Sequence, residues 1–505
     1  MINWKIRYAK IIKENPELCN SDFSILEVGS GNFGISEFVQ RKITGLEPIF
    51  NGEIGKLVEP ITGSILQNNF KENEFDFVIC IDVLEHLCHD DRKKALHEML
   101  RIAKKKVLLS FPCGEVAMWG DENYANQLKN YGLPLPSWLQ EHIENRLPKI
   151  VDIVSIINES GYQFSLIGNE GMMQHYGGIV LDQFFGSSKQ LLDIHSNKIK
   201  NEAPILDSEW DLYYSFLIDI DIDSKNKKII KPETNHKNWN QEKGSISIYT
   251  TFHAPIPLNH FGDIKPLAVG NAANNSNLNK HPTDILNNGY CLNNARWSEL
   301  SGIYKIWKEI KPTDYIGFCH YRRVFDLRCE EVAVDRFKRI SLDALPEGAT
   351  KINETLKEML NTSSIYLPPP EKLDKTIFEQ YHFIHKINDL CLVLDLIKER
   401  FPYLSESCQI VFESDLLFSN NMFITCWENF DEICNIWFTV LSDFEKLITI
   451  DTDNRYQQRD ISFLAERIFT IWIHYKKNQG VNLVHIPYFH IEYPDLNTRE
   501  WTVAV

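Results

Sequence analysis

Residues 24–34 read SILEVGSGNFG, and this stretch decides the fold of the first half of the chain. The apolar residues Ile25 to Val28 predict a short strand that runs into a glycine-rich turn, and a helix is expected from Ile35 onward. Glycine lets a ligand approach the backbone closely, and strand, glycine turn and helix in this order begin a doubly wound, nucleotide-binding fold. The stretch therefore predicts a Rossmann-like sheet.

The segments after this turn continue the alternation of strands and helices. Residues 42–47 and 75–81 predict two further strands, residues 92–103 a helix, and residues 105–112 another strand. Such alternation predicts a parallel sheet. Glu47 ends the second strand about 20 residues after the glycine turn, where an acidic side chain can accept hydrogen bonds from ribose hydroxyls.

Residues 24–115 resemble the class I S-adenosylmethionine-dependent methyltransferases, particularly the small-molecule branch. The resemblance lies in Glu27-Val-Gly29-Ser-Gly31, in Glu47, and in the segment from Phe75-Asp76 through Val83-Leu84-Glu85-His86. It implies a seven-stranded Rossmann-like sheet with a reversed last hairpin and S-adenosylmethionine as cofactor. Ser64 stands where the family often has an acidic residue that contacts adenine. The residues assigned to cofactor binding are Glu27, Gly29, Gly31, Glu47, Ser64 and Asp82.

Methylation of a hydroxyl oxygen needs a general base, because a neutral hydroxyl is a poor nucleophile. The candidate catalytic residues are His86 and, in the segment of residues 137–148, Glu141 and His142. The alternatives are helix capping and sheet packing for the Glu85–His86 pair and a solvated helix position for His142. The nearest approach to a metal cluster is His86, Cys88, His89 and Asp90, which is interpreted as loop and capping residues, so the metal ligands stay unassigned.

The second half begins anew after a polar segment, residues 223–244, which is rich in Lys and Asn and has the composition of a linker. Residues 245–252 predict a strand, residues 293–310 an amphipathic helix, and residues 314–325 a strand that carries His320, Tyr321, Arg322 and Arg323. This order predicts a second α/β domain. Adjacent arginines can bind the phosphates of a nucleotide-diphosphate sugar, although such pairs are more often structural.

Residues 245–490 resemble a family long labelled a domain of unknown function, which occurs in capsule and O-antigen gene clusters and includes glycosyltransferases. The matching stretches are Asn294 through Glu299-Leu300, Trp307-Lys308, Asp314 through Gly317, His320 through Arg323, Gln380-Tyr381 with His385, Asn421 through Phe423, and Arg459 through Leu464-Ala465-Glu466-Arg467. The resemblance implies a GT-A-like fold and sugar transfer from a nucleotide-diphosphate sugar donor.

The residues assigned to this second site fall into two groups. The expected substrate-binding residues are His253, Asn294, Tyr321, Arg322, Arg323, Asn421 and Arg459, and the expected catalytic residues are His320, Glu299 and Glu466. Glu413 and Asp415 stay open as alternative bases. A divalent metal is also left open, because Asp219, Asp221 and Asp223, and Asp451 with Asp453, match only weakly the Asp-x-Asp motif that often holds one.

Composition limits the other classes of function. The chain has 505 residues, a net charge of −16 and 11 cysteines without a CxxC pair, and no apolar run approaches the about 18–20 residues of a membrane span. The charge argues against broad nucleic-acid binding, and the cysteines indicate a reducing compartment. A cytoplasmic protein is expected, with peripheral association at the inner membrane face left open.

Together these features predict a bifunctional enzyme of surface-polysaccharide biosynthesis. Residues 1–230 would methylate a sugar hydroxyl, residues 231–244 would form a linker, and residues 245–505 would transfer a sugar. The acceptor would be a glycan or a lipid-linked oligosaccharide. The alternatives are a methyltransferase with a non-catalytic glycan-binding domain and a methyltransferase that acts on a non-sugar substrate.

Overall fold

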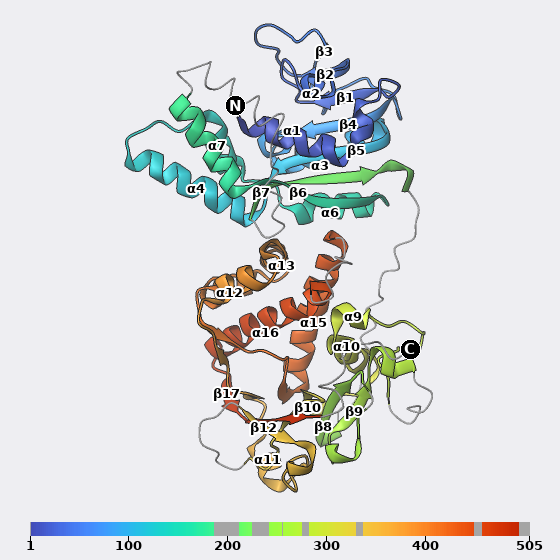
Figure 1. Ribbon diagram of the computed structural model, residues 1–505, viewed down its shortest axis with the longest axis vertical. Coiled ribbons are helices and arrows are strands. Elements are labelled where there is room, and N and C mark those ends of the chain that lie inside the picture. The colour runs from blue at the N-terminus through green and yellow to red at the C-terminus, as the bar shows by residue number, and fades with distance from the viewer. Residues whose placement is uncertain are drawn as a thin grey trace. The chain divides into compact units, whose positions relative to one another are not determined.

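A computed structural model describes residues 2–185, 212–224, 242–254, 256–274, 282–329, 337–448 and 457–493 (Figure 1). The chain divides into two compact units. The first comprises Met1–Pro232, Lys386–Asp395 and Leu447–Thr449, and the second comprises Glu233–His385, Leu396–Lys446 and Ile450–Val505. The predicted linker, residues 231–244, lies outside the described residues up to 241, and a strand begins at Glu242.

The first unit is built on a seven-stranded sheet. In the order β3-β2-β1-β4-β5-β7-β6, the strands from β3 to β5 are parallel, whereas β7 is antiparallel to both β5 and β6. This arrangement confirms the predicted seven-stranded sheet with a reversed last hairpin. The strands are β1 (Ile25–Val28), β2 (Ile43–Glu47), β3 (Val58–Thr62), β4 (Phe75–Ile81), β5 (Ala103–Pro112), β6 (Gln163–Gly171) and β7 (Tyr213–Asp221).

Helices in the first unit connect these strands. The predicted helix after the glycine turn is a single turn, because Gln40 adopts the left-handed conformation directly after it. The elements are α1 (Ile2–Glu14), η1 (Pro16–Cys19), α2 (Ser36–Val39), η2 (Leu84–His86), α3 (His89–Ile102), α4 (Gly114–Asn130), α5 (Ser137–Asn145), α6 (Ile150–Glu159), α7 (Met172–Phe185) and η3 (Ile222–Ser224).

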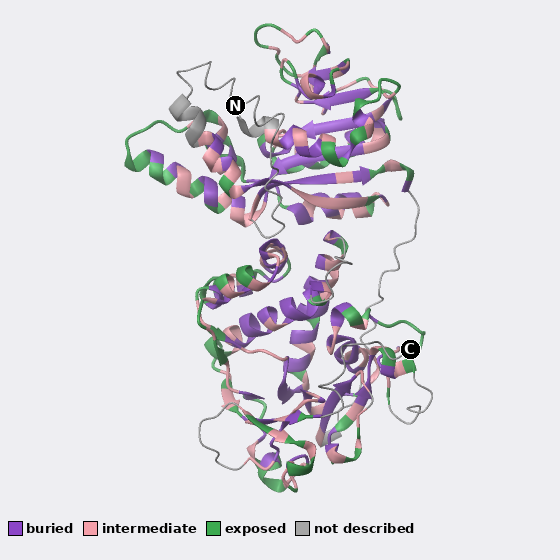
Figure 2. Ribbon diagram, viewed as in Figure 1, coloured by how far each residue is buried: buried purple, intermediate pink, exposed green. Residues whose placement is uncertain are grey.

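The central strands of this sheet are buried along almost their whole length (Figure 2). All four residues of β1 are buried, and β4 is buried except for Asp76. Burial on both faces is why these strands are mostly apolar in the sequence, apart from Glu27 and Asp76. Because β1 pairs in parallel with both β2 and β4, the residues that follow the three strands meet at one edge of the sheet.

The second unit is also α/β, as predicted, and its large sheet is mixed. One path runs β12-β18-β11-β10-β16-β13-β17, while β8 pairs with β10 and with β9. The strands are β8 (Glu242–Phe252), β9 (Lys265–Ala268), β10 (Thr313–His320), β11 (Arg323–Phe325), β12 (Phe337–Ser341), β13 (Ser364–Leu367), β16 (Phe423–Cys426), β17 (Asn482–His485) and β18 (Tyr488–Glu492), with β14 (Glu371–Lys372) and β15 (Leu416–Leu417) in a separate pair.

Two elements of the second half differ from the sequence-based expectation. The predicted helix of residues 293–310 is two helices, because Ser298 has a positive φ of 48° between them. The predicted strand of residues 314–325 reverses direction, since β10 ends at His320 and His320 pairs with Arg323 of the antiparallel β11. Tyr321 and Arg322 thus form a two-residue hairpin turn, which holds both arginines at the end of β10.

Short and long helices connect the strands of the second half of the chain. They are η4 (Asn259–Phe261), η5 (Gly270–Asn274), α9 (Asn294–Trp297), α10 (Leu300–Glu309), η7 (Leu342–Ala344), α11 (Glu354–Met359), α12 (Ile377–Ile384), α13 (Ile387–Arg400), η8 (Pro402–Leu404), α14 (Ser405–Phe412), α15 (Trp427–Leu447), η9 (Gln457–Arg459) and α16 (Asp460–Asn478). Among the described helices, none combines the length and the apolar character that a membrane crossing requires.

One buried ion pair joins α9 to α16 in the second unit. Arg296 is 2% exposed and donates from Nε and Nη2 to the two carboxylate oxygens of Asp460, at 2.8 and 2.7 Å. Removing one partner of a buried pair leaves an uncompensated charge in the interior, which typically costs about 3–5 kcal/mol. The ion pair therefore holds α9 against α16, and the stability of this contact depends on both side chains.

We expect Arg296→Ala to lower the free energy of unfolding of the second unit by about 3–5 kcal/mol. The matched control is Arg400→Ala, which removes the surface pair with Asp443 and should cost less than about 1 kcal/mol. Urea unfolding followed by tryptophan fluorescence measures both, since Trp297, Trp437 and Trp472 are fully buried in this unit. Equal losses of unfolding free energy in the two variants would contradict a stabilising role for the buried pair of Arg296 and Asp460.

Candidate functional site

The glycine turn after β1 has open space beside Gly31, whereas Gly29 is in close contact with its neighbours. Gly29 and Gly31 have φ angles of 75° and 53°. A Cβ on Gly29 would clash with the Val83 side chain, whereas a Cβ on Gly31 would meet no heavy atom within 4 Å. Gly31 N donates to Glu47 Oε2 at 3.0 Å, so the predicted ribose-binding acid lies directly beside the open glycine.

Glu27 supports this turn from inside. It is fully buried, and its two carboxylate oxygens accept hydrogen bonds from the Tyr8 hydroxyl at 2.5 Å and from Ile35 N at 2.7 Å. Burial raises the pKa of Glu27 to about 7, against the lowering effect of these two hydrogen bonds. Glu27 thus fixes the entry into α2, and its contact with a cationic amino acid moiety stays a prediction.

The other two predicted cofactor residues follow β3 and β4. Ser64 Oγ accepts a hydrogen bond from Leu66 N at 3.3 Å. Asp82 has a left-handed backbone with φ of 54°, donates its N–H to Ser110 O at 2.8 Å and forms an ion pair with Arg7. Its Oδ1 is buried and has no hydrogen-bond partner in the described part of the chain. All of these residues lie at the carboxyl edge of the sheet.

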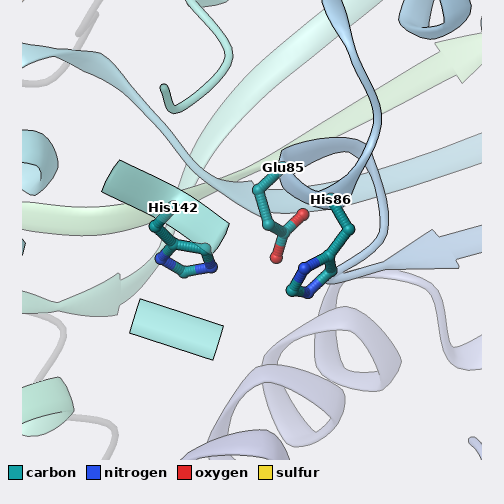
Figure 3. Close-up of side chains that lie close together, drawn as sticks. All are labelled: Glu85, His86 and His142. Carbon is teal, nitrogen blue, oxygen red and sulfur yellow. The ribbon is translucent and has the colours of Figure 1, made fainter. Parts of the chain in front are cut away.

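The three predicted catalytic residues of the first unit come together with Glu85. His86 Nδ1 lies 2.6 Å from Glu141 Oε2, and the ring of His86 lies 5.6 Å from that of His142 between centroids. Potential ligand atoms of Glu85, His86 and His142 all lie within 4.8 Å of one another. Figure 3 shows the Glu85 carboxylate between the two imidazole rings. His142 is buried, so the solvated helix position considered from the sequence is wrong.

Glu85 is the electrostatically unusual member of this group. It is 1% exposed, and burial together with the neighbouring Asp82 raises the pKa of its carboxyl well above the ordinary range. Its Oε2 has no hydrogen-bond partner among the described residues. The sequence interpretation, which linked His86 with Cys88, His89 and Asp90, missed this grouping, because His142 comes from the separate helix α5.

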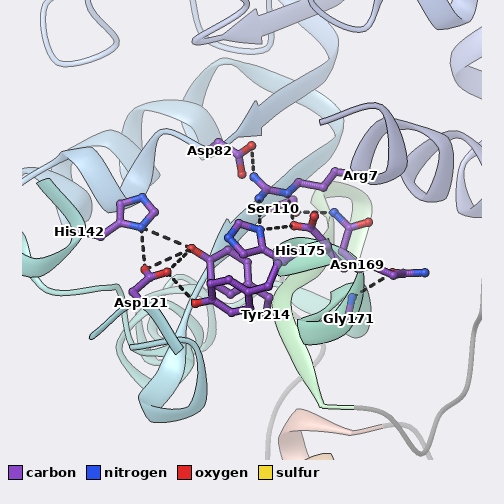
Figure 4. A network of polar contacts seen from close by, with 12 residues as sticks. Arg7, Asp82, Ser110, Asp121, His142, Asn169, Gly171, His175 and Tyr214 are labelled. Carbon is purple, nitrogen blue, oxygen red and sulfur yellow. Dashed lines mark hydrogen bonds and ion pairs between the residues drawn. The ribbon is translucent and has the colours of Figure 1, made fainter. Parts of the chain in front are cut away.

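A buried polar network lies behind these residues (Figure 4). Arg7 Nε donates to Glu170 Oε2 at 2.6 Å, and His175 lies 3.3 Å from the same oxygen and stacks on Tyr214 at 3.5 Å between centroids. Burial opposes ionisation of Glu170, yet Arg7 and His175 lower its pKa. Asp121 accepts from the hydroxyls of Tyr176 and Tyr214 and holds His142 Nδ1 at 2.9 Å.

Sequence reasoning missed Arg7, Asp121, Glu170 and His175. None of them follows a strand in the motif region, and none belongs to a recognisable spacing. Arg7 lies in α1, Asp121 in α4 and Glu170 near the end of β6, so only the folded chain brings them together.

In the second unit, a cationic cluster forms around the carboxyl ends of β8 and β10. His253 follows β8 and His320 ends β10, and these strands are parallel neighbours with His320 opposite Thr251. The ring of Tyr321 lies 5.3 Å from that of His253 and 4.4 Å from that of His320, between centroids. Arg322 N donates to His320 Nδ1 at 3.3 Å. The predicted residues from these two strands are therefore close together.

Three arginines set the charge of this cluster. Burial, with Arg322 and Arg459, lowers the pKa of His253 to about 4. Burial, with Arg323, His253, Arg322 and Arg459, lowers the pKa of His320 well below its ordinary value. Both histidines are accordingly neutral near pH 7, and the positive charge of the cluster belongs to the guanidinium groups.

The acidic residues of the second site lie next to a strained asparagine. Asn421 is buried, has a φ of 48°, and donates from Nδ2 to Glu299 Oε1 at 2.8 Å. Glu466 accepts from Asn420 N at 2.7 Å, and burial raises its pKa while Arg467 and Arg323 lower it. Glu299 and Glu466 thus accept hydrogen bonds from two consecutive residues of the same loop.

The remaining predicted residues divide into three groups. Asn294 donates to Ser298 O and Ser301 Oγ at 2.7 and 2.9 Å, so it stabilises the break between α9 and α10. Glu413 is exposed at the end of α14 and Asp415 lies 3.9 Å from Lys372, and the described structure records no hydrogen bond between either and the arginines. Asp219 and Asp221 lie in β7, whereas Asp451 and Asp453 lie outside the described residues.

Two protein families match separate parts of the chain. Residues 26–111 match the family described as "Methyltransferase domain", and residues 247–478 match the family described as "Domain of unknown function (DUF4422)". No curated relative matches the chain.

Similar solved structures include proteins that resemble one half of the chain each. The bifunctional glycosyltransferase WbbM, in its apo form, is 24% identical with a TM-score of 0.44 over 49% of this chain and 46% of its own, so the chain spans less than half of that protein. Magnesium protoporphyrin IX methyltransferase from Synechocystis PCC 6803 is 14% identical, with a TM-score of 0.28 over 44% of this chain and 82% of its own. Phosphoethanolamine N-methyltransferase 2 from Haemonchus contortus is 16% identical, with a TM-score of 0.29 over 43% and 52%.

These TM-scores are low, and the two family matches identify the domains without them. The methyltransferase match covers β1 to β5 and the residues at their carboxyl ends, including the glycine turn. The second match covers the cationic cluster from His320 to Arg459. The chain therefore carries a match to a methyltransferase domain in residues 26–111, followed by a match to the DUF4422 domain in residues 247–478.

Proposed function

We propose that this protein is a bifunctional enzyme of surface-polysaccharide biosynthesis. Its first domain would transfer a methyl group from S-adenosylmethionine to a sugar hydroxyl, and its second would transfer a sugar from a nucleotide-diphosphate donor. The observation that carries the proposal is the pairing of two sites in one chain. An open glycine turn lies beside an acid in the methyltransferase domain, and an arginine cluster lies at a strand end in the second domain.

The residues at the edge of the first sheet fit S-adenosylmethionine. Gly31 leaves open space where a ligand can approach the backbone, and Glu47 lies at the end of β2 where ribose hydroxyls are bound in doubly wound folds. Ser64 offers a hydroxyl toward the adenine in our assignment, and Glu27 keeps the turn rigid. When bound, S-adenosylmethionine supplies an electrophilic methyl group.

The sugar as acceptor is inferred from the neighbouring domain. A sugar hydroxyl must lose its proton as it attacks, and His86, Glu141 and His142 are the groups at this edge that can assist. His86 and Glu141 are both partly exposed, whereas His142 is buried against Asp121. The three groups therefore lie between solvent and the buried network, where an acceptor can enter.

The second site fits a diphosphate leaving group. Guanidinium groups recognise phosphate oxygens with two parallel hydrogen bonds. Arg322 and Arg459 lower the pKa of both histidines, and Arg323 lowers that of His320. As the bond from sugar to diphosphate breaks, negative charge develops on the diphosphate, and fixed cations lower that barrier. Glu299 and Glu466, which accept hydrogen bonds from the consecutive residues Asn421 and Asn420, are our candidates for the base that activates the acceptor.

We expect Gly31→Asn to weaken S-adenosylmethionine binding at least tenfold, because the new side chain occupies the open space beside Glu47. Asparagine tolerates the left-handed backbone better than most residues, so the turn should keep its conformation. Isothermal titration calorimetry on the full chain measures the Kd. The matched control is Gly161→Asn, at a second positive-φ glycine whose Cβ would also meet nothing within 4 Å. Tight binding by Gly31→Asn would exclude this turn as the binding site.

We expect Arg323→Ala to reduce sugar transfer by about 10²–10³-fold, since removing one preorganised donor to a developing anion typically costs that much. Arg323→Lys should restore part of the rate, because lysine keeps the charge but not the two-pronged geometry. Release of nucleoside diphosphate from a panel of nucleotide sugars is the measurement. Arg339→Ala, on strand β12, which β18 separates from β11, is the control and should leave the rate unchanged. A normal rate in Arg323→Ala would exclude the cluster from catalysis.

A further inference from the structure

Three potential metal ligands converge at the carboxyl edge of the first sheet. Glu85 and His86 lie in η2 after β4, and His142 lies in α5, yet their ligand atoms are within 4.8 Å of one another (Figure 3). The two imidazole rings and one carboxylate are a donor set typical of catalytic zinc and of other divalent first-row metals, which leave further coordination positions open.

Both histidines are oriented as metal-binding histidines usually are. The Nδ1 atom of His86 lies 2.6 Å from Glu141, and the Nδ1 atom of His142 lies 2.9 Å from Asp121. In metal sites, the ring nitrogen that does not bind the metal typically donates to a carboxylate, which fixes the tautomer and the ring orientation. With Nδ1 as the donor in each ring, Nε2 carries the lone pair that a cation would accept.

Glu85 supplies the second, independent sign of a missing partner. It is 1% exposed, and its Oε2 is buried without a hydrogen-bond partner among the described residues. A buried carboxylate oxygen left in this state costs free energy, and a bound cation would remove that cost. Arg92, a buried cation nearby, directs its Nε to Leu84 O at 2.8 Å and its Nη2 to Arg146 O at 2.6 Å.

We propose that Glu85, His86 and His142 bind a divalent transition-metal cation, which orients the acceptor hydroxyl for methylation. The role of the cation rests on the proposed function. Val83, two residues before Glu85, packs against Gly29 of the glycine turn, so the cation would lie next to the methyl-donor site. His86 and His142 are then ligands, and neither is the general base.

The chemistry requires no further reactant. A hydroxyl oxygen bound to the cation loses its proton to water more readily, because the cation lowers its pKa. The oxygen electron pair then forms the bond to the methyl carbon, while the electron pair of the carbon–sulfur bond returns to sulfur. The products are the methyl ether, the neutral thioether of the donor and one proton in solution. A sugar with two neighbouring hydroxyls could fill two open coordination positions.

The test is direct metal binding to the full chain after treatment with a chelator. Zn²⁺ is titrated by calorimetry, and Co²⁺ is titrated by visible absorption, whose d–d bands report coordination by protein nitrogen and oxygen. We expect saturable binding of one cation at the site. His86→Ala and Glu85→Gln should each weaken binding at least tenfold and remove the absorption band. Zn²⁺ should raise the Tm of the wild type, and this rise should be lost in both variants.

The matched control is His89→Ala, three residues along the chain, which removes an exposed histidine outside the cluster and should bind as the wild type does. Unchanged binding in His86→Ala, or no saturable binding in the wild type, overturns the proposal. S-adenosylmethionine binding, measured on the same preparation, separates the two hypotheses. A protein that binds the methyl donor but no cation refutes the metal site alone, and one that binds the cation but not the donor refutes the proposed function.

Discussion

The first domain depends on the buried guanidinium of Arg7. It forms ion pairs with Asp82 at the end of β4 and with Glu170 near the end of β6, so it joins the amino-terminal helix to two strands that are not neighbours in the sheet. The carboxylate of Glu170 is held away from water and needs such a cation, and the buried guanidinium in turn needs its carboxylate partners. Asp82 is kept in the left-handed conformation at this point, and that conformation directs the following residues, Val83 to His86, across the edge of the sheet.

The strands near the glycine turn could be predicted from the sequence, and the reason is physical. A parallel strand buried on both faces is mostly apolar, as β1 and β4 are apart from Glu27 and Asp76. β1 ends before Gly29 and β4 ends before Asp82. The two-residue turn at Tyr321 and Arg322 could not be predicted, because it contains none of the Gly, Asn or Asp residues that usually mark such turns. The break between α9 and α10 at Ser298 could not be predicted either, because the helical spacing of apolar residues continues across it.

The side chains of the two sites show the same division. The positions of Glu47 and the glycines could be predicted from the sequence because they follow directly from the ends of β1 and β2. Asp121 and Glu170 could not, because their partners come from helices and strands far away in the sequence. In the second domain, the sequence placed the arginines, but only the fold shows that His253 and His320 share their environment and are neutral. The electrostatic character of a site is a property of burial, which no local pattern encodes.

The hairpin between β10 and β11 has an evolutionary consequence. Successive residues of a strand point to opposite faces, so a one-residue shift of register at this tight turn would exchange the faces of the side chains of β11. Such a change would also shift β11 against β18, which pairs with it over Arg323 to Phe325. Related proteins can therefore change this site by substituting side chains, whereas a change in the length of the β10–β11 turn would disrupt the pairing of β11. Diversity among relatives should accumulate in the identity of these positions and leave their spacing intact.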